Sequence, residues 1–133
     1  MFDLFEEKCI VAVYEEVLNE LKKIEKEDKR DFRKILKMIK MLAKRCFFNN
    51  PEQWKPLKGE ICQMFGIWEL KPKPYRLAFF KDFYRNKECF VIYEIWRKEG
   101  KRKDRKLIEK ICSKAQTIKE KWIYFKEKGG ENA

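Results

Sequence analysis

The feature that most limits how this chain can fold is the stretch from Trp54 to Trp96. Three segments rich in aromatic and β-branched residues follow one another there, at residues 68–71, 75–80 and 89–96, and prolines or polar residues separate them. Residues of these types favour strands, and short turn-forming connections favour pairing between consecutive strands. The stretch therefore predicts a small antiparallel sheet, a meander, with basic residues at the ends of its strands.

Two amphipathic helices are predicted before this stretch. Apolar residues recur with the 3.6-residue period of a helix over residues 13–26 and again over residues 32–46. The polar run between them is typical of a short turn, in which Asp28 or Asp31 caps the second helix. We expect the two helices to form an antiparallel hairpin whose apolar side packs on the sheet.

The first and last parts of the sequence each add one predicted element. Residues 9–13 fit either a short strand or the start of the first helix. After a basic turn, Asp104 caps a last helix whose apolar stripe keeps helical spacing until Gly129 and Gly130. We expect this stripe to lie in the core, with a surface for a partner protein as the alternative.

The predicted fold is α+β, with an N-terminal helical hairpin packed on a small antiparallel meander sheet and a C-terminal helix. The 133 residues contain no Gly/Ser-rich break, and 44% of them are apolar, which is enough to bury one core. We therefore expect a single domain over residues 1–133. Its parts are a possible short strand and the hairpin at 1–53, the sheet and basic turn at 54–103, and the last helix at 104–128.

The net charge of +11 is concentrated in the second half of the sequence. Residues 1–53 carry 12 basic and 11 acidic side chains, whereas residues 97–121 carry 11 basic and 4 acidic ones. A basic excess of this size indicates a polyanionic partner. The alternative is that the charge only keeps the protein in solution.

The sequence offers no recognisable metal or cofactor motif. It has no histidine, and its five cysteines are scattered without a CxxC pair, so the usual zinc patterns are absent. We expect buried or incidental thiols, no metal and no cofactor. The cysteines are Cys9, Cys46, Cys62, Cys89 and Cys112.

The first residues lack a signal-peptide pattern, and no apolar run is long enough to span a membrane. These two features predict a cytoplasmic protein without a membrane partner.

Arg76 is the most unusual residue of the predicted strands. The two-residue period of a strand puts it on the same face as Ala78 and Phe80. A guanidinium in so apolar a strand needs a partner. Either it pairs with a carboxylate, Glu69 or Glu94, or it points into a cleft to meet an anion.

A series of motifs runs through residues 54–115. In order, they are Leu57-Lys58-Gly59, Trp68-Glu69-Leu70-Lys71, Tyr75-Arg76, the apolar run 89–96, and a basic turn from Arg97 through Lys106. This series resembles the RelE/ParE toxin superfamily, and most closely its HigB-like branch, the phage-derived host-inhibition branch of type II toxin–antitoxin systems. Members share a Leu-Lys-Gly loop, a strand ending Trp-Glu-Leu-Arg, a Tyr-Arg strand, an apolar strand and a basic turn into the last helix.

The resemblance implies a RelE-like fold and a candidate activity. Members that cut RNA are mRNA interferases: they cleave mRNA on the translating ribosome, where a ribose 2′-OH attacks the adjacent phosphate and leaves a cyclic phosphate. The implied partners are mRNA, the ribosome and a cognate antitoxin, and the implied effect is translation inhibition. Such an endoribonuclease needs a base, cations for the charge on the phosphoryl oxygens and a proton donor, and it needs no metal.

The resemblance also implies roles for particular residues. Arg76 matches the Tyr-Arg position, and its planar fork suits a phosphate. Lys71 stands where the superfamily usually has Arg, so the charge is kept and the bidentate fork is lost. Arg97, Lys98 and Lys101 lie in the basic turn, which holds a further catalytic or phosphate-binding cation in the cleaving members. The predicted nucleic-acid contacts, by charge or by base stacking, are Lys55, Lys58, Trp68, Tyr75, Trp96, Arg102, Lys103 and Arg105.

One departure from the superfamily leaves alternatives open. Cleaving members often place a Tyr or His just after the basic turn, where this chain has Lys103 and Asp104. Proton transfer then falls to Lys71, Lys98 or Lys101, or cleavage is lost. The alternatives are a ParE-like gyrase inhibitor and a non-catalytic RNA- or DNA-binding module of the same fold, whose affinity falls steeply with salt.

Overall fold

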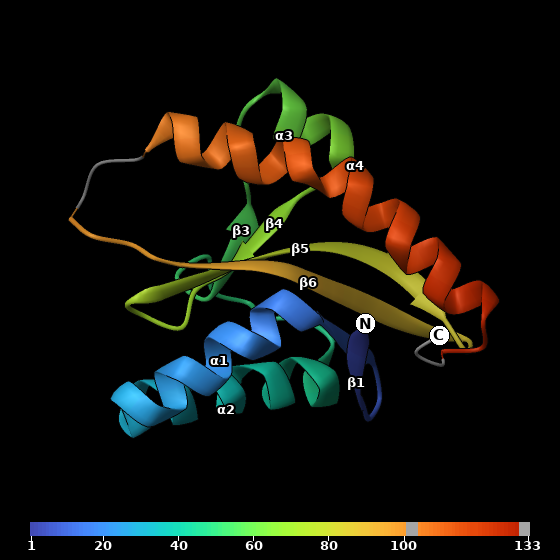
Figure 1. Ribbon diagram of the computed structural model, residues 1–133, viewed down its shortest axis with the longest axis horizontal. Helices are drawn as coiled ribbons and strands as arrows, with labels where there is room; N and C mark the ends of the chain where they lie inside the picture. The colour runs from blue at the N-terminus through green and yellow to red at the C-terminus, as the bar shows by residue number, and fades with distance from the viewer. Residues whose placement is uncertain (101–103, 131–133) are drawn as a thin grey trace.

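The computed structural model describes residues 1–100 and 104–130, and these residues form six strands and four helices (Figure 1). None of these helices is both long enough and apolar enough to cross a membrane. In chain order the elements are β1 (Phe2–Glu6), β2 (Ile10–Tyr14), α1 (Glu15–Glu27), α2 (Lys29–Arg45), β3 (Trp54–Pro56), α3 (Glu60–Phe65), β4 (Trp68–Leu70), β5 (Tyr75–Tyr84), β6 (Lys87–Arg97) and α4 (Arg105–Glu127).

The six strands form one mixed sheet in the order β1-β2-β6-β5-β4-β3. Neighbouring strands are antiparallel except β2 and β6, which run parallel with Ile10 opposite Cys89. Parallel neighbours need a long crossover, and here the chain from α1 to β5 supplies it. All five residues of β2 are buried, as expected for a strand with helices on both of its faces.

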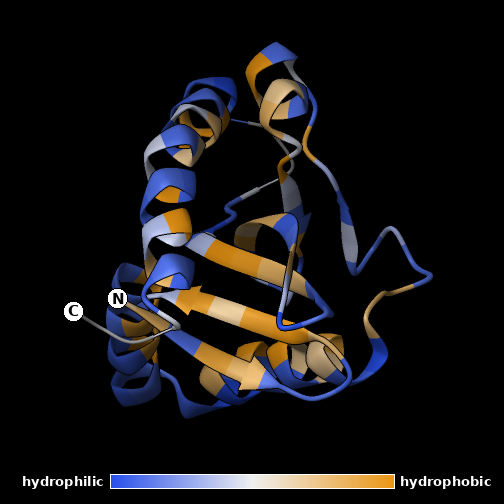
Figure 2. Cartoon of the chain, turned by 90° about the vertical axis from the view of Figure 1, so that its right-hand side faces the viewer, coloured by the Kyte–Doolittle hydropathy of each residue, from blue (hydrophilic) through white to orange (hydrophobic). Residues whose placement is uncertain are grey.

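Each face of the sheet is covered by its own pair of helices (Figure 1). Helices α1 and α2 pack on the face that carries Leu77 and Phe79, which we call the α1/α2 face. Helices α3 and α4 pack on the face that carries Ala78 and Phe80, the α3/α4 face. Figure 2 shows the strands as mainly hydrophobic and the long helices as striped. The apolar stripe of α4 is buried, so it belongs to the core and is not a free partner surface.

Local capping signals place the helix starts close to the predicted positions. The Asp28 side chain accepts hydrogen bonds from the backbone N–H groups of Arg30 and Asp31 at the start of α2. The Asp104 side chain accepts one from the Leu107 N–H at the start of α4. These bonds satisfy N–H groups that have no partner within the helix, which confirms both predicted caps.

The predicted fold class is wrong at the N-terminus and in the sheet. The chain begins with strands and not with the helical hairpin, because residues 2–6 pair with residues 10–14 and extend the sheet. The sheet is not a three-stranded antiparallel meander, since it has six strands and one parallel pair. Residues 54–56, which lie outside the three predicted strand segments, form β3 by pairing with β4. Strand β2 was hard to predict because its partner β6 lies about 80 residues away in the sequence, and β1 pairs only with β2.

The expectation of unpaired thiols is wrong for four of the five cysteines. Cys9 is bonded to Cys46, which joins the start of β2 to the end of α2. Cys62 is bonded to Cys112, which joins α3 to α4. Sequence separations of 37 and 50 residues leave no local pattern from which these pairs can be predicted. Cys89 is free and buried, and its burial raises the pKa of the thiol to about 12.

Candidate functional site

A groove of about 870 Å³ opens on the α3/α4 face, between the start of α3 and the start of α4. Its other walls come from β3, from the loop that follows it, and from β4, β5 and the end of β6. Many of the predicted site residues therefore meet in one place although they are far apart in the sequence. Those that line the groove are Lys55, Lys58, Arg76, Trp96, Arg97, Lys98 and Arg105.

A buried ion pair between Arg76 and Glu69 lies in the wall of this groove. Arg76 Nε is 3.0 Å from Glu69 Oε1, and the two side chains are 8% and 10% exposed. The Nε–H makes no hydrogen bond of suitable geometry within the described residues, so the contact is mainly electrostatic. Arg76 Nη1 donates to the backbone oxygen of Tyr75 at 3.2 Å. Of the two predicted alternatives for Arg76, the structure shows the carboxylate partner, which is Glu69, and Arg76 also lines the groove.

Strand register explains why these two residues meet. Glu69 on β4 lies opposite Ala78 on β5, and Arg76 is two residues from Ala78 on the same strand face. On the other side of β5, Arg76 lies opposite Trp96 of β6, which also lines the groove. The pair is therefore held by regular strand geometry and not by a loop, which keeps the two charges in a fixed relation.

The described lining of the groove is close to charge balance. It holds six basic and five acidic side chains, so it is not a uniformly positive channel. A carboxylate beside a guanidinium offers a proton acceptor next to an anion-binding group. The acidic lining residues are Glu60, Glu69, Glu99, Asp104 and Glu109.

Two predicted base-stacking residues lie on the opposite face of the sheet. Trp68 and Tyr75 pack against the α1/α2 core. The Lys81 ammonium group lies over the Trp68 ring, 4.0 Å from its centre. Strand alternation is the cause, because Trp68 precedes Glu69 and Tyr75 precedes Arg76, so each points away from the groove. Among the described aromatic candidates, only Trp96 lines the groove.

Two predicted cations are also turned away from the groove wall. The Arg97 guanidinium lies 5.9 Å from the centre of the Tyr75 ring, although part of Arg97 lines the groove. The Lys71 ammonium group donates to the backbone oxygen of Pro51 at 3.1 Å. Partial burial, together with the nearby charge of Lys55, lowers the pKa of Lys71. A lowered pKa suits a proton-transfer group, and the charges of Glu69 and Arg76 act on Lys71, but its ammonium group is bound to Pro51 and Lys71 does not line the groove.

Lys98 is better placed than Lys71. Its backbone N–H donates to the oxygen of Pro74 at 2.9 Å, which fixes the end of β6 next to the start of β5, and Lys98 lines the groove. Three further predicted cations, Lys101, Arg102 and Lys103, lie outside the described residues.

From the sequence, Glu69 was expected only as a possible partner of Arg76 and not as a residue that lines the groove. Its place in the groove follows from the alternation of β4, because Trp68 and Leu70 face the α1/α2 core. A carboxylate between two core-facing apolar residues therefore indicates a side chain on the opposite face of the strand. This indication could be used only after the pairing of β4 with β5 was known.

Comparison with known proteins supports the fold and leaves the family open. The sequence matches no known protein-family profile. It is 35% identical over 81 residues to an uncharacterized protein of Aquifex aeolicus, a match that covers 59% of this chain and 56% of that protein. The structure resembles a YoeB/ParE toxin from Agrobacterium tumefaciens, with a TM-score of 0.52 and 16% identity.

This chain has a YoeB/ParE-like fold. The structural match covers 98% of the Agrobacterium toxin and 67% of this chain, so about a third of the chain has no counterpart there. The sequence-based expectation of a RelE/ParE-type fold is confirmed at that level, and the HigB-like branch stays a prediction.

Proposed function

We propose that this protein is the toxin of a type II toxin–antitoxin system and that it cleaves mRNA on the ribosome. The observation that carries the proposal is the buried Arg76–Glu69 pair in the wall of a groove that also holds Lys55, Lys58 and Lys98. A non-specific binding surface has no use for a buried carboxylate among its cations, because that carboxylate repels phosphate. A transesterification site needs a base, and a carboxylate can act as that base.

The proposed reaction uses the side chains of the groove directly. Glu69 accepts the proton of a ribose 2′-OH, and the 2′-oxygen attacks the adjacent phosphorus. Arg76 stabilises the charge that develops on the phosphoryl oxygens. The 5′-oxygen leaves with a proton from Lys98, so one proton enters Glu69 and one leaves Lys98. The products are a 2′,3′-cyclic phosphate and a 5′-hydroxyl end.

This scheme supplies the proton donor that the missing Tyr or His provides in related toxins. Lys98 lies in the groove and is anchored through its backbone to Pro74. The base is then Glu69 and not a lysine, which revises the roles expected from the sequence. Lys55 and Lys58 bind flanking phosphates, and Trp96 stacks on a base, a contact worth about 1–3 kcal/mol.

Toxicity of this kind requires a partner that silences it. We propose an antitoxin that covers the groove and presents both acidic groups for the lysines and a basic group for the acidic rim. An excess of such a partner keeps the toxin bound by mass action.

The test is primer extension on an abundant mRNA from cells that briefly express the protein. Three chains are compared: the parent, the double variant Glu69→Leu/Arg76→Met, and Lys37→Ala as a control on the exposed side of α2. The double variant removes both charges together, so no unpaired buried charge is left to unfold the chain. Breaks within translated codons are expected for the parent and the control only.

Each other outcome supports a different function. Growth arrest with intact mRNA favours the ParE-like reading, in which the toxin inhibits DNA gyrase. Intact mRNA with salt-sensitive RNA binding favours a non-catalytic module. Breaks of equal strength in the double variant contradict the assignment of the site.

A further inference from the structure

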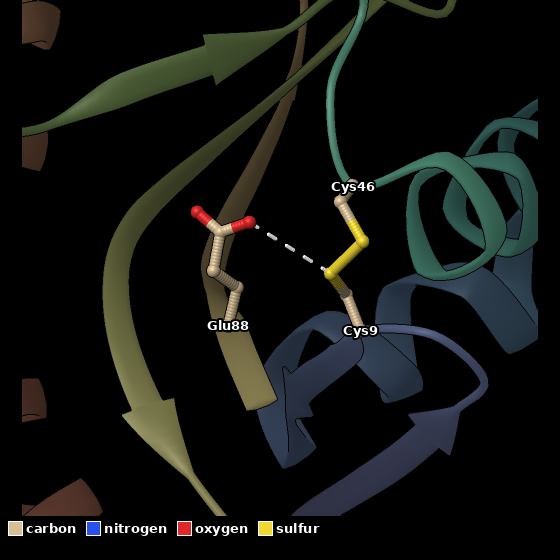
Figure 3. Close-up of side chains that lie close together, drawn as sticks. All are labelled: Cys9, Cys46 and Glu88. Atoms are coloured by element: carbon tan, nitrogen blue, oxygen red, sulfur yellow. Dashed lines mark hydrogen bonds between the residues drawn. A yellow bond between two sulfur atoms is a disulfide. The ribbon is translucent and has the colours of Figure 1, made fainter. Parts of the chain in front are cut away.

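A second cluster of reactive side chains lies on the α1/α2 side of the sheet, away from the groove. Cys9 lies just before β2, Cys46 lies just after α2, and Glu88 lies on β6 and points at the Cys9–Cys46 disulfide (Figure 3). One potential ligand atom from each residue lies within 4.8 Å of the other two. Cys9 is buried, Cys46 is partly exposed and Glu88 is exposed, so solvent reaches the cluster from the Glu88 side.

The backbone holds the two cysteines together independently of the disulfide. The Cys9 N–H donates to the oxygen of Ala43 in the last turns of α2, at 2.8 Å. Cys46 caps α2 in the left-handed conformation, with φ of 69°, and its own N–H donates to Leu42. The Cα atoms of Cys9 and Cys46 are 5.6 Å apart. Because hydrogen bonds and the packed core fix this distance, the two sulfurs stay near each other after the disulfide is reduced.

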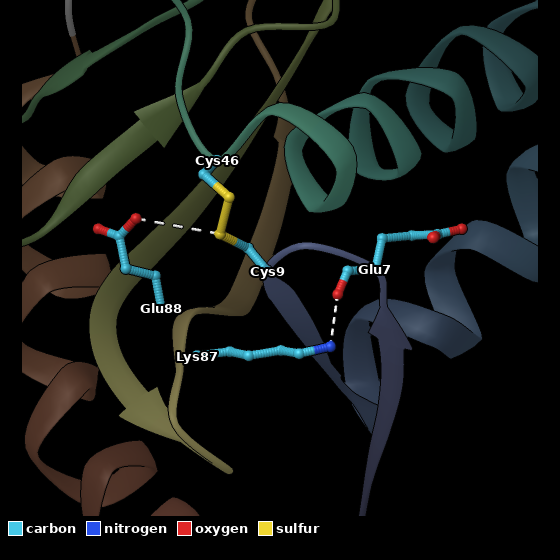
Figure 4. Close-up of a disulfide and its surroundings, with 5 residues drawn as sticks. All are labelled: Glu7, Cys9, Cys46, Lys87 and Glu88. Carbon is cyan, nitrogen blue, oxygen red and sulfur yellow. Dashed lines mark hydrogen bonds between the residues drawn. A yellow bond between two sulfur atoms is a disulfide. The ribbon is translucent and has the colours of Figure 1, made fainter.

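Glu88 is held in place by the sheet and, among the described residues, forms no ion pair. The parallel register of β2 and β6 sets Ile10 opposite Cys89, which brings the neighbouring residues Cys9 and Glu88 together. Lys87, its neighbour, is turned away and donates to the backbone oxygen of Glu7 at 2.6 Å (Figure 4).

Cys9 can donate a hydrogen bond to Glu88 only when the disulfide is reduced. Cys9 Sγ lies 3.9 Å from Glu88 Oε2. A disulfide sulfur carries no proton and cannot donate to a carboxylate, so this contact gives the oxidised chain no hydrogen bond. After reduction the same atoms are two thiols and a carboxylate that face one another.

We propose that Cys9, Cys46 and Glu88 form a binding site for Zn²⁺ or a similar divalent ion, and that the disulfide closes this site. A small dithiol reduces the disulfide: the S–S bond breaks, each sulfur gains one electron and one proton, and the dithiol becomes a cyclic disulfide. The metal ion then displaces both thiol protons and is bound by two thiolates, one carboxylate oxygen and a water. This set satisfies the tetrahedral preference of Zn²⁺, and its soft thiolates disfavour Mg²⁺ and Ca²⁺.

The proposal makes metal binding and oxidation mutually exclusive. A bound metal ion protects the thiolates from forming the disulfide, and the disulfide removes both sulfur ligands. The proposed metal site does not depend on the proposed ribonuclease function, because the metal-binding residues and the groove lie on opposite faces of the sheet.

The test is a titration of the full chain with Co²⁺, a spectroscopic substitute for Zn²⁺, with and without prior reduction. The reduced parent is expected to bind one Co²⁺ per chain with a thiolate-to-metal absorption band, and Zn²⁺ is expected to abolish the band. The oxidised parent is expected to show no band. Zn²⁺ should also raise the Tm of the reduced chain and leave that of the oxidised chain unchanged.

Matched variants separate this cluster from the other thiols. Glu88→Gln, at an exposed position, is expected to weaken Co²⁺ binding roughly tenfold or more, whereas Glu7→Gln is expected to have no effect. The double variant Cys62→Ser/Cys112→Ser should keep the thiolate-to-metal absorption band. In Cys9→Ser this band should fall below the intensity that two thiolate ligands give. A reduced parent without a band, or equal affinity in the parent and Glu88→Gln, overturns the proposal.

Discussion

The Arg76–Glu69 pair allows a direct test of how well the wall of the groove shields charged side chains from water. In the variant Arg76→Met the side chain keeps most of its volume and loses its charge, and the Glu69 carboxylate stays behind. Both side chains of the pair are at least 90% buried, at 8% and 10% exposed. Removing one partner of such a pair leaves an uncompensated charge in a poorly solvated place, which costs about 3–5 kcal/mol.

Two features of the structure set the expected value at the lower end of that range. Glu69 borders an open groove, so water reaches it more easily than in a closed core. The carboxylate can also take up a proton and become neutral. We therefore expect Arg76→Met to lower the free energy of unfolding by about 3 kcal/mol. In the double variant Glu69→Leu/Arg76→Met no charge remains, and its stability should lie within about 1 kcal/mol of the parent or above it.

The assay is urea unfolding of the parent, both single variants and the double variant, followed by tryptophan fluorescence with the disulfides intact. Equal slopes of the free energy against urea are needed for the comparison. A loss below about 1 kcal/mol in Arg76→Met is typical of an exposed ion pair and contradicts the buried geometry. A double variant as unstable as the single one contradicts the charge argument, because lost packing is then the cause.

Further predictions concern groups outside the groove. The Cys89 thiol, whose pKa burial raises to about 12, should resist alkylation at pH 8 in the native non-reduced chain, and one thiol per chain should react after unfolding. Burial acts to raise the pKa of Asp82, but hydrogen bonds, of which that from Lys126 is the largest, lower this pKa below its ordinary value. This stabilisation is therefore present above the unfolded pKa and is lost as the pH falls below about 4, so Asp82→Asn should show less acid loss of stability in melts at pH 3–7. Replacing Cys62 and Cys112 by serine opens a loop of about 50 residues and should lower the free energy of unfolding by about 4 kcal/mol in the same urea assay.

Elements with local signals were predictable from the sequence. The α1, α2 and α4 helices have a helical apolar period, and Asp28 and Asp104 cap α2 and α4 by accepting hydrogen bonds from neighbouring N–H groups. Strands β4, β5 and β6 have aromatic and β-branched runs joined by short turns. In each case the residues that decide the structure lie within a few positions of one another.

Features that depend on distant contacts were not predictable in this way. The parallel pairing of β2 with β6 joins segments about 80 residues apart, and no local pattern selects it. The alternation around Arg76 correctly separates the two faces of β5, but it does not say which helices cover each face. Trp68 and Tyr75, which were predicted as base-stacking contacts, face α1 and α2, on the side of the sheet opposite Arg76.

The most direct test of the central claim is the chemistry of the cut RNA ends. A translating extract is incubated with the parent protein or with Glu69→Leu/Arg76→Met, and the ends of the mRNA fragments are analysed. We predict 2′,3′-cyclic phosphate and 5′-hydroxyl ends with the parent, and intact mRNA with the folded double variant. Intact mRNA with the parent, or the same ends with the double variant, contradicts the assignment of Arg76 and Glu69 as a cleavage site.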